Sequence, residues 1–517
     1  MPIDTIAGRT LLDVLADDAR VLPATTVIEY EGRTVSYGDL WTMVERAAGA
    51  LAAEGVQPGD KVMLHLPNCP EYVALWFAIV RAGGVVVPCS THFKLDEIRY
   101  QIEHSDTVVV IVSPEDEALV RDAAAAATNP RIMVCKPGAL GDGTAEVNQL
   151  FAGPSLAGPE HDASPDDVAM IMYTSGTTAR PKGVVLTHGN LLHYANSWAS
   201  AYHYTRFDRV LHYFPLFHVN GGVAILMPAI TRGATIVMLP KFSVTNFVDL
   251  VTTHDITVTA LNATHVKYLL STPPTEHDAD HRCYRAHFAL ELEGAERRMF
   301  ETRFGIRLVE LYGQTESGIV TCAPVDAGWR EGAGPPVPGT TIKLVDEDDI
   351  EVPAGAIGEI ACQTISRHGT SPGYYKDPGE TAAVKRAGWH YTGDMGYVDD
   401  DGYLYFSHRK KDMIKRSGYN IGAAEVERVL AEHEAVDEVA VVGVPDPLKQ
   451  EAIVAFVVAS AGSAPDPEAL IAHCRLHLAD YKVPSYVAVV DALPETFIGK
   501  LDKKRLRELA LERFVAS

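Results

Sequence analysis

The sequence predicts an α/β protein with a large N-terminal domain, a β-rich section within that domain, and a small C-terminal α/β domain. Two observations lead to this fold class. The chain has 517 residues, which exceeds what one hydrophobic core usually supports, so at least two domains are expected. Short apolar runs alternate with amphipathic stretches along most of the chain, and this alternation is typical of layered helices and strands.

The N-terminal part carries scaffold elements rather than motifs. A hairpin is expected at 27–30 and 33–35, and Ser36 can cap a helix whose apolar positions recur every three to four residues. Residues 137–166 are rich in Gly, Pro, Ser and Asp, which favours a surface connection. The elements expected between them are a strand at 61–66, a helix at 72–82, a strand at 84–88, a helix at 95–104 and a strand at 108–112.

The same mixed pattern continues to the end of the chain. A β-rich section is expected around 342–345 and 358–362, with a hairpin turn at 399–402. The elements expected in the last part are a helix with Val426, Val429 and Leu430 on its apolar face, buried strands at 439–444 and 453–458, and a helix at 467–478.

Composition excludes several classes of function. The 45 basic and 68 acidic residues give a formal net charge of −23, which disfavours a nucleic-acid or anionic-membrane surface. No basic segment leads into an apolar stretch at the N-terminus, and no apolar run is long enough to span a bilayer, so we expect a cytoplasmic protein without membrane insertion. The seven cysteines are scattered without a Cys-x-x-Cys pair, which predicts reduced structural thiols.

The stretch 173–183 is the first candidate for chemistry. It joins two apolar runs and contains hydroxyls, glycines and two cations, all of which can face a polyphosphate. It is not a Walker A loop, because no Gly-Lys-Ser/Thr triplet stands at the required distance and the chain continues as a strand. An ordinary polar hairpin connection is the alternative. The candidate phosphate-binding residues are Thr174, Ser175, Gly176, Thr177, Thr178 and Lys182.

This stretch closely resembles the phosphate motif of the adenylate-forming superfamily, which includes acyl-CoA ligases, luciferases and peptide-synthetase adenylation domains. The resemblance covers nearly the whole chain. It implies an N-terminal adenylation domain of several subdomains at 1–408 and a mobile C-terminal domain at 409–517 that carries a catalytic lysine. The other matching stretches follow in the superfamily's order at 214–222, 311–316, 389–394, 409–421 and 493–503.

The match at 311–316 implies a nucleotide and metal site. Tyr312 offers a flat face for adenine beside Gly313, and Thr315 offers a hydroxyl for the α-phosphate. Glu316 offers a carboxylate oxygen for Mg²⁺, which prefers oxygen ligands and bridges phosphates. Thr174 is the second metal-binding candidate.

The matches at 389–394 and 409–421 imply ribose, hinge and CoA contacts. Asp394 matches the aspartate that accepts both ribose hydroxyls, with a turn aspartate as the alternative. Arg409 would also hold ribose, and Lys411 occupies the interdomain hinge position. The basic run at 409–416 is isolated in an acidic chain, which argues against a nucleic-acid patch. Three further candidates for binding nucleotide or CoA are Lys415, Gly418 and Tyr419.

Two further residues are candidate catalytic groups. His218 matches the aromatic or histidine side chain between the activated acyl group and the incoming nucleophile, and a satisfied histidine at a helix start is the alternative. Lys500 matches the C-terminal lysine that reaches the active site, where its charge would stabilise the reacting carboxylate and α-phosphate.

The resemblance therefore implies an acid–thiol ligase that uses ATP, Mg²⁺ and CoA. A small carboxylic acid would attack the α-phosphate, release pyrophosphate and form acyl-AMP, after which the C-terminal domain would rotate and CoA would take the acyl group. Transfer to an amine, chemistry on an oxyanion such as nitrite, and a catalytically silent nucleotide-binding protein are the alternatives. The oligomeric state stays open, with a homodimer as the commonest default.

The segment 288–293 departs from the small, neutral segment that most acyl-CoA ligases carry against adenine. This departure, together with the residues at 177–183, makes the chain resemble carnitine and crotonobetaine CoA ligases more than fatty-acid ligases. Glu291 and Glu293 can face a cationic substrate or lie on a solvated helix face, and the second interpretation is favoured because lone charges are usually exposed. The acid itself is not identified by the sequence.

Overall fold

The structure is a computed structural model of the chain. It describes residues 8–138, 149–155, 163–174, 181–289, 292, 294–416, 419–446, 449–478, 480–496 and 501–515. The chain divides into two compact units. Unit 1 comprises Met1–Ile342 and Cys362–Tyr391, and unit 2 comprises Lys343–Ala361 and Thr392–Ser517.

Unit 1 contains a seven-stranded sheet in the order β17-β8-β7-β4-β3-β5-β6. The strands from β7 to β6 are parallel, whereas β8 and β17 join the edge in antiparallel fashion. The central strands are buried on both faces and are therefore continuously apolar rather than alternating. Their bounds are β3 Lys61–His65, β4 Val85–Pro88, β5 Thr107–Val112, β6 Arg131–Val134, β7 Val168–Thr174, β8 Lys182–Thr187 and β17 Gly373–Tyr374.

Unit 1 also contains an eight-stranded sheet in the order β14-β13-β12-β11-β9-β10-β1-β2. Only the edge strands β2 and β14 pair in antiparallel fashion. The bounds are β1 Thr26–Tyr30, β2 Arg33–Ser36, β9 Arg209–His212, β10 Thr235–Met238, β11 Val258–Asn262, β12 Arg285–Ala289, β13 Arg307–Gln314 and β14 Gly318–Cys322.

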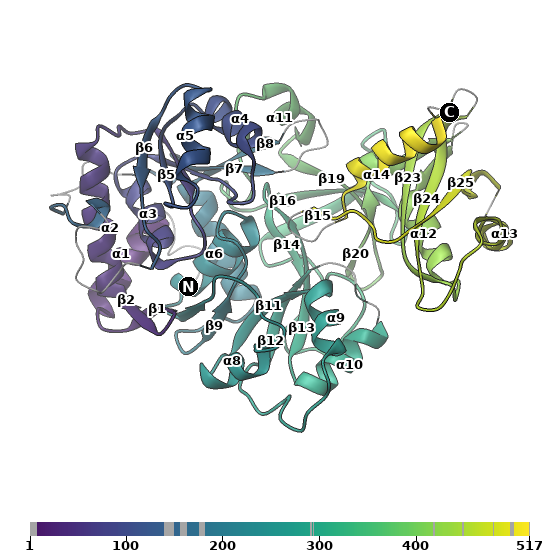
Figure 1. Ribbon diagram of the computed structural model, residues 1–517, viewed down its shortest axis with the longest axis horizontal. Coiled ribbons are helices and arrows are strands. Elements are labelled where there is room, and N and C mark those ends of the chain that lie inside the picture. The colour runs from purple at the N-terminus through teal and green to yellow at the C-terminus, as the bar shows by residue number, and fades with distance from the viewer. Residues whose placement is uncertain are drawn as a thin grey trace. The chain divides into compact units, whose positions relative to one another are not determined.

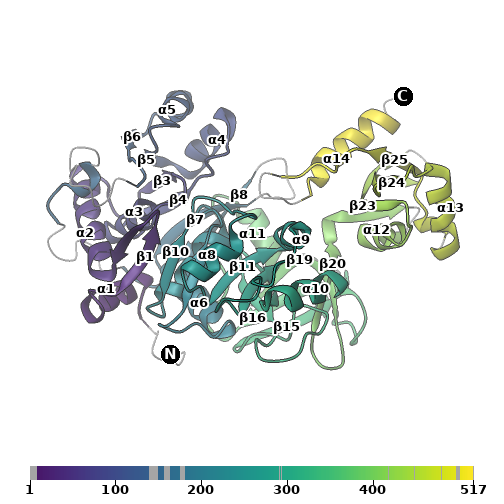
Figure 2. The ribbon, with the colours of Figure 1, turned by 60° about the horizontal axis from the view of Figure 1, so that its bottom comes forward.

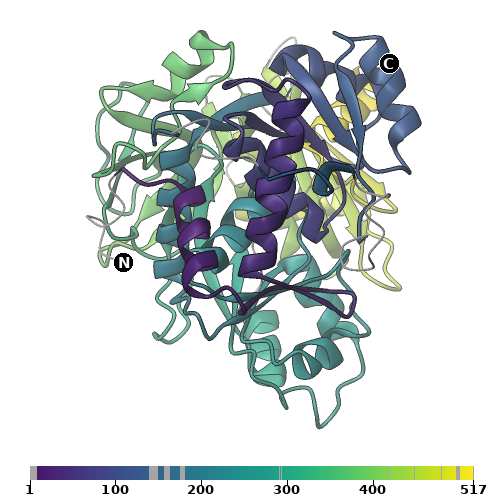
Figure 3. The same ribbon diagram turned by 90° about the vertical axis from the view of Figure 1, so that its left-hand side faces the viewer.

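The helices of unit 1 form three layers around these sheets. Helices α1, α2, α3, α6 and α7 share one hydrophobic core with strands of both sheets, and Figures 1 and 3 show α1 and α2 side by side in purple. Helices α4 and α5 cover the outer face of the seven-stranded sheet, and α8, α9 and α10 cover that of the eight-stranded sheet (Figure 1). The bounds are α1 Leu11–Val21, α2 Tyr37–Ala53, α3 Pro70–Arg81, α4 Leu95–Ser105, α5 Glu117–Ala125, α6 His188–Ala201, α7 Met227–Ile230, α8 Phe247–Thr253, α9 Ala263–Ser271 and α10 Gly294–Phe304.

Local sequence signals explain where these elements begin. The Ser36 hydroxyl accepts from Asp39 N at 3.1 Å and the Asp39 carboxylate accepts from Ser36 N at 3.2 Å, so a capping box starts α2 as expected. Its apolar face is fully buried, including Leu40, Val44 and Leu51. The expected strands and helices up to Val112 are likewise confirmed within two residues at their ends.

A further sheet has the order β15-β16-β19-β18, with β20 paired to β19. The hairpin turn expected at 399–402 is confirmed between β19 and β20. The bounds are β15 Thr340–Val345, β16 Gly358–Thr364, β18 Lys385–Arg386, β19 Trp389–Val398 and β20 Leu404–Arg409, with α11 at Pro378–Val384.

Unit 2 contains a second five-stranded sheet, β22-β21-β24-β23 with β25 on β24. Residues alternate between two cores along β23 and β24: α12 and α13 pack on one face and α14 on the other (Figure 2). The bounds are β21 Met413–Arg416, β22 Tyr419–Gly422, β23 Val436–Asp446, β24 Gln450–Ala459, β25 Tyr486–Val490, α12 Ala423–Ala431, α13 Pro467–His477 and α14 Lys503–Ala510. The C-terminal helices and strands expected from apolar spacing are confirmed.

Three further observations concern the chain as a whole. The C-terminal unit takes 343–361 and 392–408 in addition to the residues after 408, so the domain boundary at 408/409 stays a prediction about where a hinge lies. All seven cysteines are buried free thiols. Across the described ranges, no helix has both the length and the apolar character needed to cross a membrane.

Candidate active site

The phosphate-loop stretch lies between two antiparallel strands of unit 1. Strand β7 ends at Thr174 and β8 begins at Lys182, and these two residues are paired in the ladder. The chain therefore continues as a strand after the loop, as expected, which separates this site from a Walker A loop. Four of the expected phosphate-binding residues lie outside the described residues: Ser175, Gly176, Thr177 and Thr178.

Lys182 is largely buried and already has an anionic partner. Its side chain is 11% exposed, and its Nζ makes an ion pair with the Glu380 carboxylate. The ammonium also lies 5.3 Å from the centre of the Tyr374 ring, a cation–π distance. Glu380 is fixed in turn because its backbone N–H donates to the Asp377 carboxylate that caps α11. A phosphate would thus meet a lysine that is held in place.

Glu316 occupies the turn between β13 and β14. Gly313 lies opposite Ile319 and Gln314 opposite Gly318 across this turn, and a Cβ on Gly313 would lie 2.2 Å from Gly318 O. The backbone oxygen of Glu316 accepts from the Tyr194 hydroxyl at 2.9 Å and from Ser371 N at 2.7 Å. These contacts fix the backbone position of the carboxylate.

Tyr374 connects the phosphate strand to this turn. It belongs to β17, which pairs with β8 so that Tyr374 lies opposite Val184. Its hydroxyl donates to the Glu316 carboxylate at 2.9 Å, while its ring faces Lys182. One tyrosine therefore holds together the cation of the phosphate strand and the candidate metal ligand, which are separated by 134 positions in the sequence.

The remaining nucleotide candidates of unit 1 lie on the same hairpin. Tyr312 is in β13 and is buried, and Thr315 is a buried residue in the turn next to Glu316. Gln314, the last residue of β13, contacts His390 Nε2 at 3.3 Å. The strand expected at 307–310 thus continues for four more residues. Tyr312 therefore lies in a paired strand rather than in a loop.

His218 lies in the turn before a π-helical segment, Asn220–Leu226. Its backbone N–H donates to Pro215 O at 3.0 Å, and its Nδ1 accepts from Asn220 N at 3.2 Å. The half-buried ring thus contributes to the helix start, as the alternative interpretation expected. Single π-helical turns are frequent at functional sites.

Unit 2 holds the ribose candidates. Asp394 in β19 and Arg409 in β20 are cross-strand partners, and the Arg409 Nε lies 3.2 Å from the Asp394 carboxylate. Asp394 is buried whereas Arg409 is 45% exposed, so the guanidinium can leave the aspartate for a ligand. Four expected residues lie outside the described residues or side chains: Lys415, Gly418, Tyr419 and Lys500.

Sequence reasoning missed Tyr374 and Glu380. Neither stands in a motif that suggests chemistry by itself, and Glu380 looks like an ordinary first-turn acid of a short helix. The one available signal was Asp377-Pro378, which marks a helix start and so places Glu380 in the first turn. Its partner could not be found from spacing.

Comparison with known proteins adds independent observations to this geometry. A family model described as AMP-binding enzyme matches residues 15–375, and a second, described as AMP-binding enzyme C-terminal domain, matches residues 425–500. The chain belongs to this family of AMP-binding enzymes.

Curated relatives and solved structures of the family cover the whole chain. The crotonobetaine/carnitine–CoA ligase of Salmonella typhi is 33% identical over 520 residues, covering 98% of this chain and 100% of its own. The ATP-bound MatB of Rhodopseudomonas palustris is 30% identical with a TM-score of 0.88, covering 97% of this chain and 99% of its own. The o-succinylbenzoate CoA synthetase of Bacillus subtilis, in complex with its acyl-adenylate intermediate, is 27% identical with a TM-score of 0.82 over 97% and 98%.

The protein is therefore an AMP-forming acyl-CoA ligase with a large N-terminal and a small C-terminal domain. The resemblance stated from the six motifs is confirmed, as is the α/β fold class. Members of this family use ATP to activate a carboxylic acid and transfer the acyl group to CoA. The substrates of this protein are therefore a carboxylic acid, ATP and CoA.

Proposed function

We propose that this ligase activates a small carboxylic acid at the site formed by the 174–182 strands and the Glu316 turn. Lys182 would bind the outer phosphates of ATP, Tyr312 and Gly313 the adenine, and Thr315 the α-phosphate. Asp394 and Arg409 would bind the ribose. The observation that carries the assignment is the chain of contacts from Lys182 through Tyr374 to Glu316.

These contacts support the assignment because they place the groups that phosphoryl chemistry needs next to one another. A buried ammonium and a carboxylate are held by one tyrosine without pairing directly with each other. Such an arrangement places a cation and a carboxylate near one another, and fixed groups need little reorganisation during reaction, while a phosphate has to compete with Glu380 for Lys182.

The residues present fit a magnesium ion. The donors at the turn are carboxylate and hydroxyl oxygens, which Mg²⁺ prefers, and within the described ranges no cluster of three or more acidic, histidine or cysteine side chains forms a separate metal cage. Glu316 and Thr174 would hold the ion together with ATP phosphates. When bound, it would neutralise phosphate charge.

In our proposal, the chain's own contribution to catalysis is positioning and charge. Lys182 would hold the leaving pyrophosphate, and Lys500 would stabilise negative charge on the reacting oxygens of carboxylate and α-phosphate. His218 would lie between the activated acyl group and the thiol. Lys415, Gly418 and Tyr419 would line the route of CoA after the C-terminal domain rotates about Lys411.

The proposed function is tested by pyrophosphate release with a panel of acids, each with and without CoA. The panel begins with betaine acids, because the similar Salmonella proteins are crotonobetaine/carnitine–CoA ligases, and continues with aromatic, dicarboxylic and fatty acids. We expect one class to give CoA-dependent thioester. Product formed with an amine but not with CoA would favour the alternative acceptor, and no pyrophosphate release with any acid would favour a silent homologue.

We also propose that the enzyme acts in the cytoplasm, where ATP, CoA and reduced thiols occur together. Fractionation of cells that express a tagged full-length chain tests this location. A homodimer stays the default expectation, and light scattering of the purified chain measures it.

A further inference from the structure

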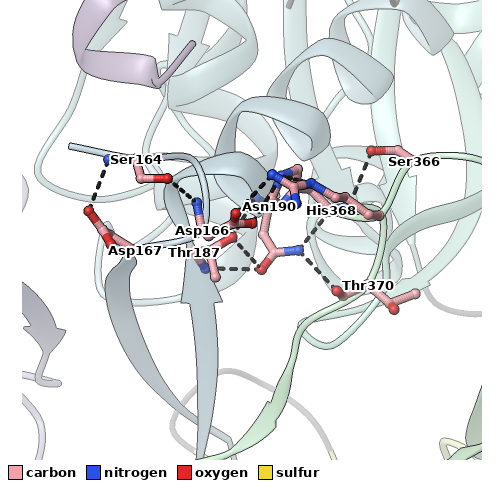
Figure 4. Close-up of polar contacts among 9 residues, drawn as sticks. Ser164, Asp166, Asp167, Thr187, Asn190, Ser366, His368 and Thr370 are labelled. Atoms are coloured by element: carbon pink, nitrogen blue, oxygen red, sulfur yellow. Dashed lines mark hydrogen bonds and ion pairs between the residues drawn. The ribbon is translucent and has the colours of Figure 1, made fainter. Parts of the chain in front are cut away.

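A second polar site lies on unit 1 beside the first turn of α6. It is an open recess of about 410 Å³, and none of the residues that line it belongs to the proposed catalytic or nucleotide-binding set. Its walls come from the segment before β7, from the start of α6 and from the loop that precedes β17 (Figure 4).

Hydrogen bonds hold the loop that precedes β17 against the first turn of α6. Asn190 completes the capping box of α6 with Thr187, and its amide Nδ2 donates to His368 O at 2.6 Å and Thr370 O at 3.0 Å (Figure 4). Gly189 permits this approach, because a Cβ there would lie 2.4 Å from the His368 ring. The recess is therefore a fixed feature of the fold rather than a gap beside a loose loop.

Charges at the rim compensate each other. The Asp166 carboxylate lies 2.8 Å from Arg367 Nη2 and 3.6 Å from His368 Nε2. Arg367 Nε donates to the same His368 nitrogen at 3.2 Å, which requires a neutral imidazole. Burial, reinforced by the Arg367 charge, lowers the pKa of His368 accordingly. Asp166 and Arg367 thus cancel, and His368 adds no charge.

The remaining charge is the ammonium of Lys385, the first residue of β18. Its Nζ donates to Thr370 Oγ1 at 2.7 Å, and among the described residues it has no ion-pair partner within 4.0 Å. An ammonium has three donors, so two stay for a ligand. Burial lowers the pKa of Lys385 to about 8, and the charge of Glu316 opposes this shift only in part.

Ser371 provides a second donor on the same lining. The residue is 2% exposed, and its hydroxyl has no hydrogen-bond partner in the part of the chain that the structure describes. A buried hydroxyl without a partner is costly, and a bound ion or water is one way to satisfy it. Its backbone N–H donates to Glu316 O at 2.7 Å, so the residue also holds the turn of the active site.

We propose that this recess binds a small oxyanion, phosphate or a carboxylate, through the Lys385 ammonium and the Ser371 hydroxyl. Among the residues that line the recess, Lys385, Arg367 and Asp166 sum to one net positive charge, and the N-terminal end of α6 adds a favourable dipole. An anion there supplies the missing partner of both groups. The site is distinct from the phosphate loop and goes beyond the proposed function.

The experiment is calorimetric titration of inorganic phosphate into the full-length chain and its variants at constant ionic strength. We expect two sites in the unaltered chain, one at the phosphate loop and one in the recess. Lys385→Met should weaken the recess site at least tenfold and Ser371→Ala several-fold, while Lys182→Met removes the other site. Lys376→Met is the matched control, because this lysine forms a surface ion pair with Asp106 and should change neither site.

The proposal is overturned if Lys385→Met and Ser371→Ala keep both phosphate sites at unaltered affinity, or if the unaltered chain has a single site that Lys182→Met removes. Circular dichroism checks folding, and Lys385→Arg, which keeps the charge, should retain binding if Lys385→Met fails to fold. Acetate that displaces phosphate from the Lys385-dependent site identifies a carboxylate ligand, whereas acetate that does not displace it identifies phosphate.

Discussion

At the scale of single residues, the site depends on charges whose partners are already in place. Lys182 is the clearest case, because the same ammonium that we assign to the phosphates of ATP is paired with Glu380 in the chain alone. The ion pair orients the lysine, but a phosphate must compete with the carboxylate for it. The balance between these two effects can be measured.

Glu380→Gln should lower the KM for ATP roughly threefold to tenfold, because it removes the competing charge and keeps the size of the side chain; a tenfold change corresponds to about 1.4 kcal/mol. Pyrophosphate release at varied ATP measures it. Glu45→Gln is the control, since it breaks the similarly buried Arg81–Glu45 pair outside the proposed site. An increase in KM would show that Glu380 acts mainly by orienting Lys182.

A half-buried carboxylate in α1 predicts a pH-dependent stability. Burial, with a smaller effect of the Asp17 charge, raises the pKa of Asp18 from 3.8 to about 6, and its Oδ2 has no hydrogen-bond partner among the described residues. The folded state therefore favours the protonated form, so stability is lost as pH rises from about 4 through 6.

Asp18→Asn should remove this loss. We expect it to raise the free energy of unfolding by about 1–2 kcal/mol at pH 7, a value reduced from the full pKa difference because the side chain is partly exposed, and to have little effect below pH 4. Urea unfolding at several pH values measures the difference. A gain that does not vary with pH would rule out titration of Asp18 as its cause.

At the scale of elements, the start of α6 both caps its helix and holds a distant loop. The capping box of α6 also holds the 366–370 loop through Asn190, whereas the hydrogen bonds between Asn262 and His265 that cap α9 stay within the cap. The two helices therefore provide a matched pair that separates local capping from tertiary docking.

Asn190→Ala should destabilise the chain by about 2–4 kcal/mol, because it removes the cap and leaves two partly buried carbonyl oxygens without their donor. Asn262→Ala should cost only about 1 kcal/mol, the usual value of a cap. Urea unfolding compares them. Equal losses would mean that the contacts to the loop add nothing to stability.

At the scale of the whole molecule, the proposed mechanism divides the two half-reactions between two arrangements of the C-terminal domain. Lys500→Ala should reduce acyl-AMP formation roughly 100- to 1000-fold, the usual effect of removing one charge-stabilising group, and spare transfer of the acyl group from supplied acyl-AMP to CoA. Pyrophosphate exchange and thioester formation measure the two halves. Equal loss in both would contradict the assignment of Lys500.

The hinge proposal makes the opposite prediction. Lys411→Pro restricts the backbone where the domain is proposed to rotate, so thioester formation should fall by at least tenfold while pyrophosphate exchange changes little. Lys449→Pro, in another exposed segment of the same unit, tests whether a proline in this unit is harmful by itself. Unchanged thioester formation in Lys411→Pro would place the hinge elsewhere.

The sequence by itself determined the elements and the motifs. The Ser36 capping box, the apolar faces of α2 and α12 and the paired strands around the phosphate loop follow from neighbours a few positions apart, so periodicity and capping chemistry predict them. The six motifs likewise identified the family, because each is a short local pattern. Predicting the elements and the motifs did not require knowledge of contacts between residues that are far apart in the sequence.

Only the tertiary structure decided which groups meet. Lys182 and Glu380 are 198 positions apart and Tyr374 and Glu316 are 58 apart, and both pairs form because β17 joins the sheet beside β8. The recess of Lys385 and Ser371 arises in the same way, from a loop docked on α6. Strand order and loop docking are set by the global burial of apolar faces, which local periodicity does not encode, and this is why these partners emerged only from the fold.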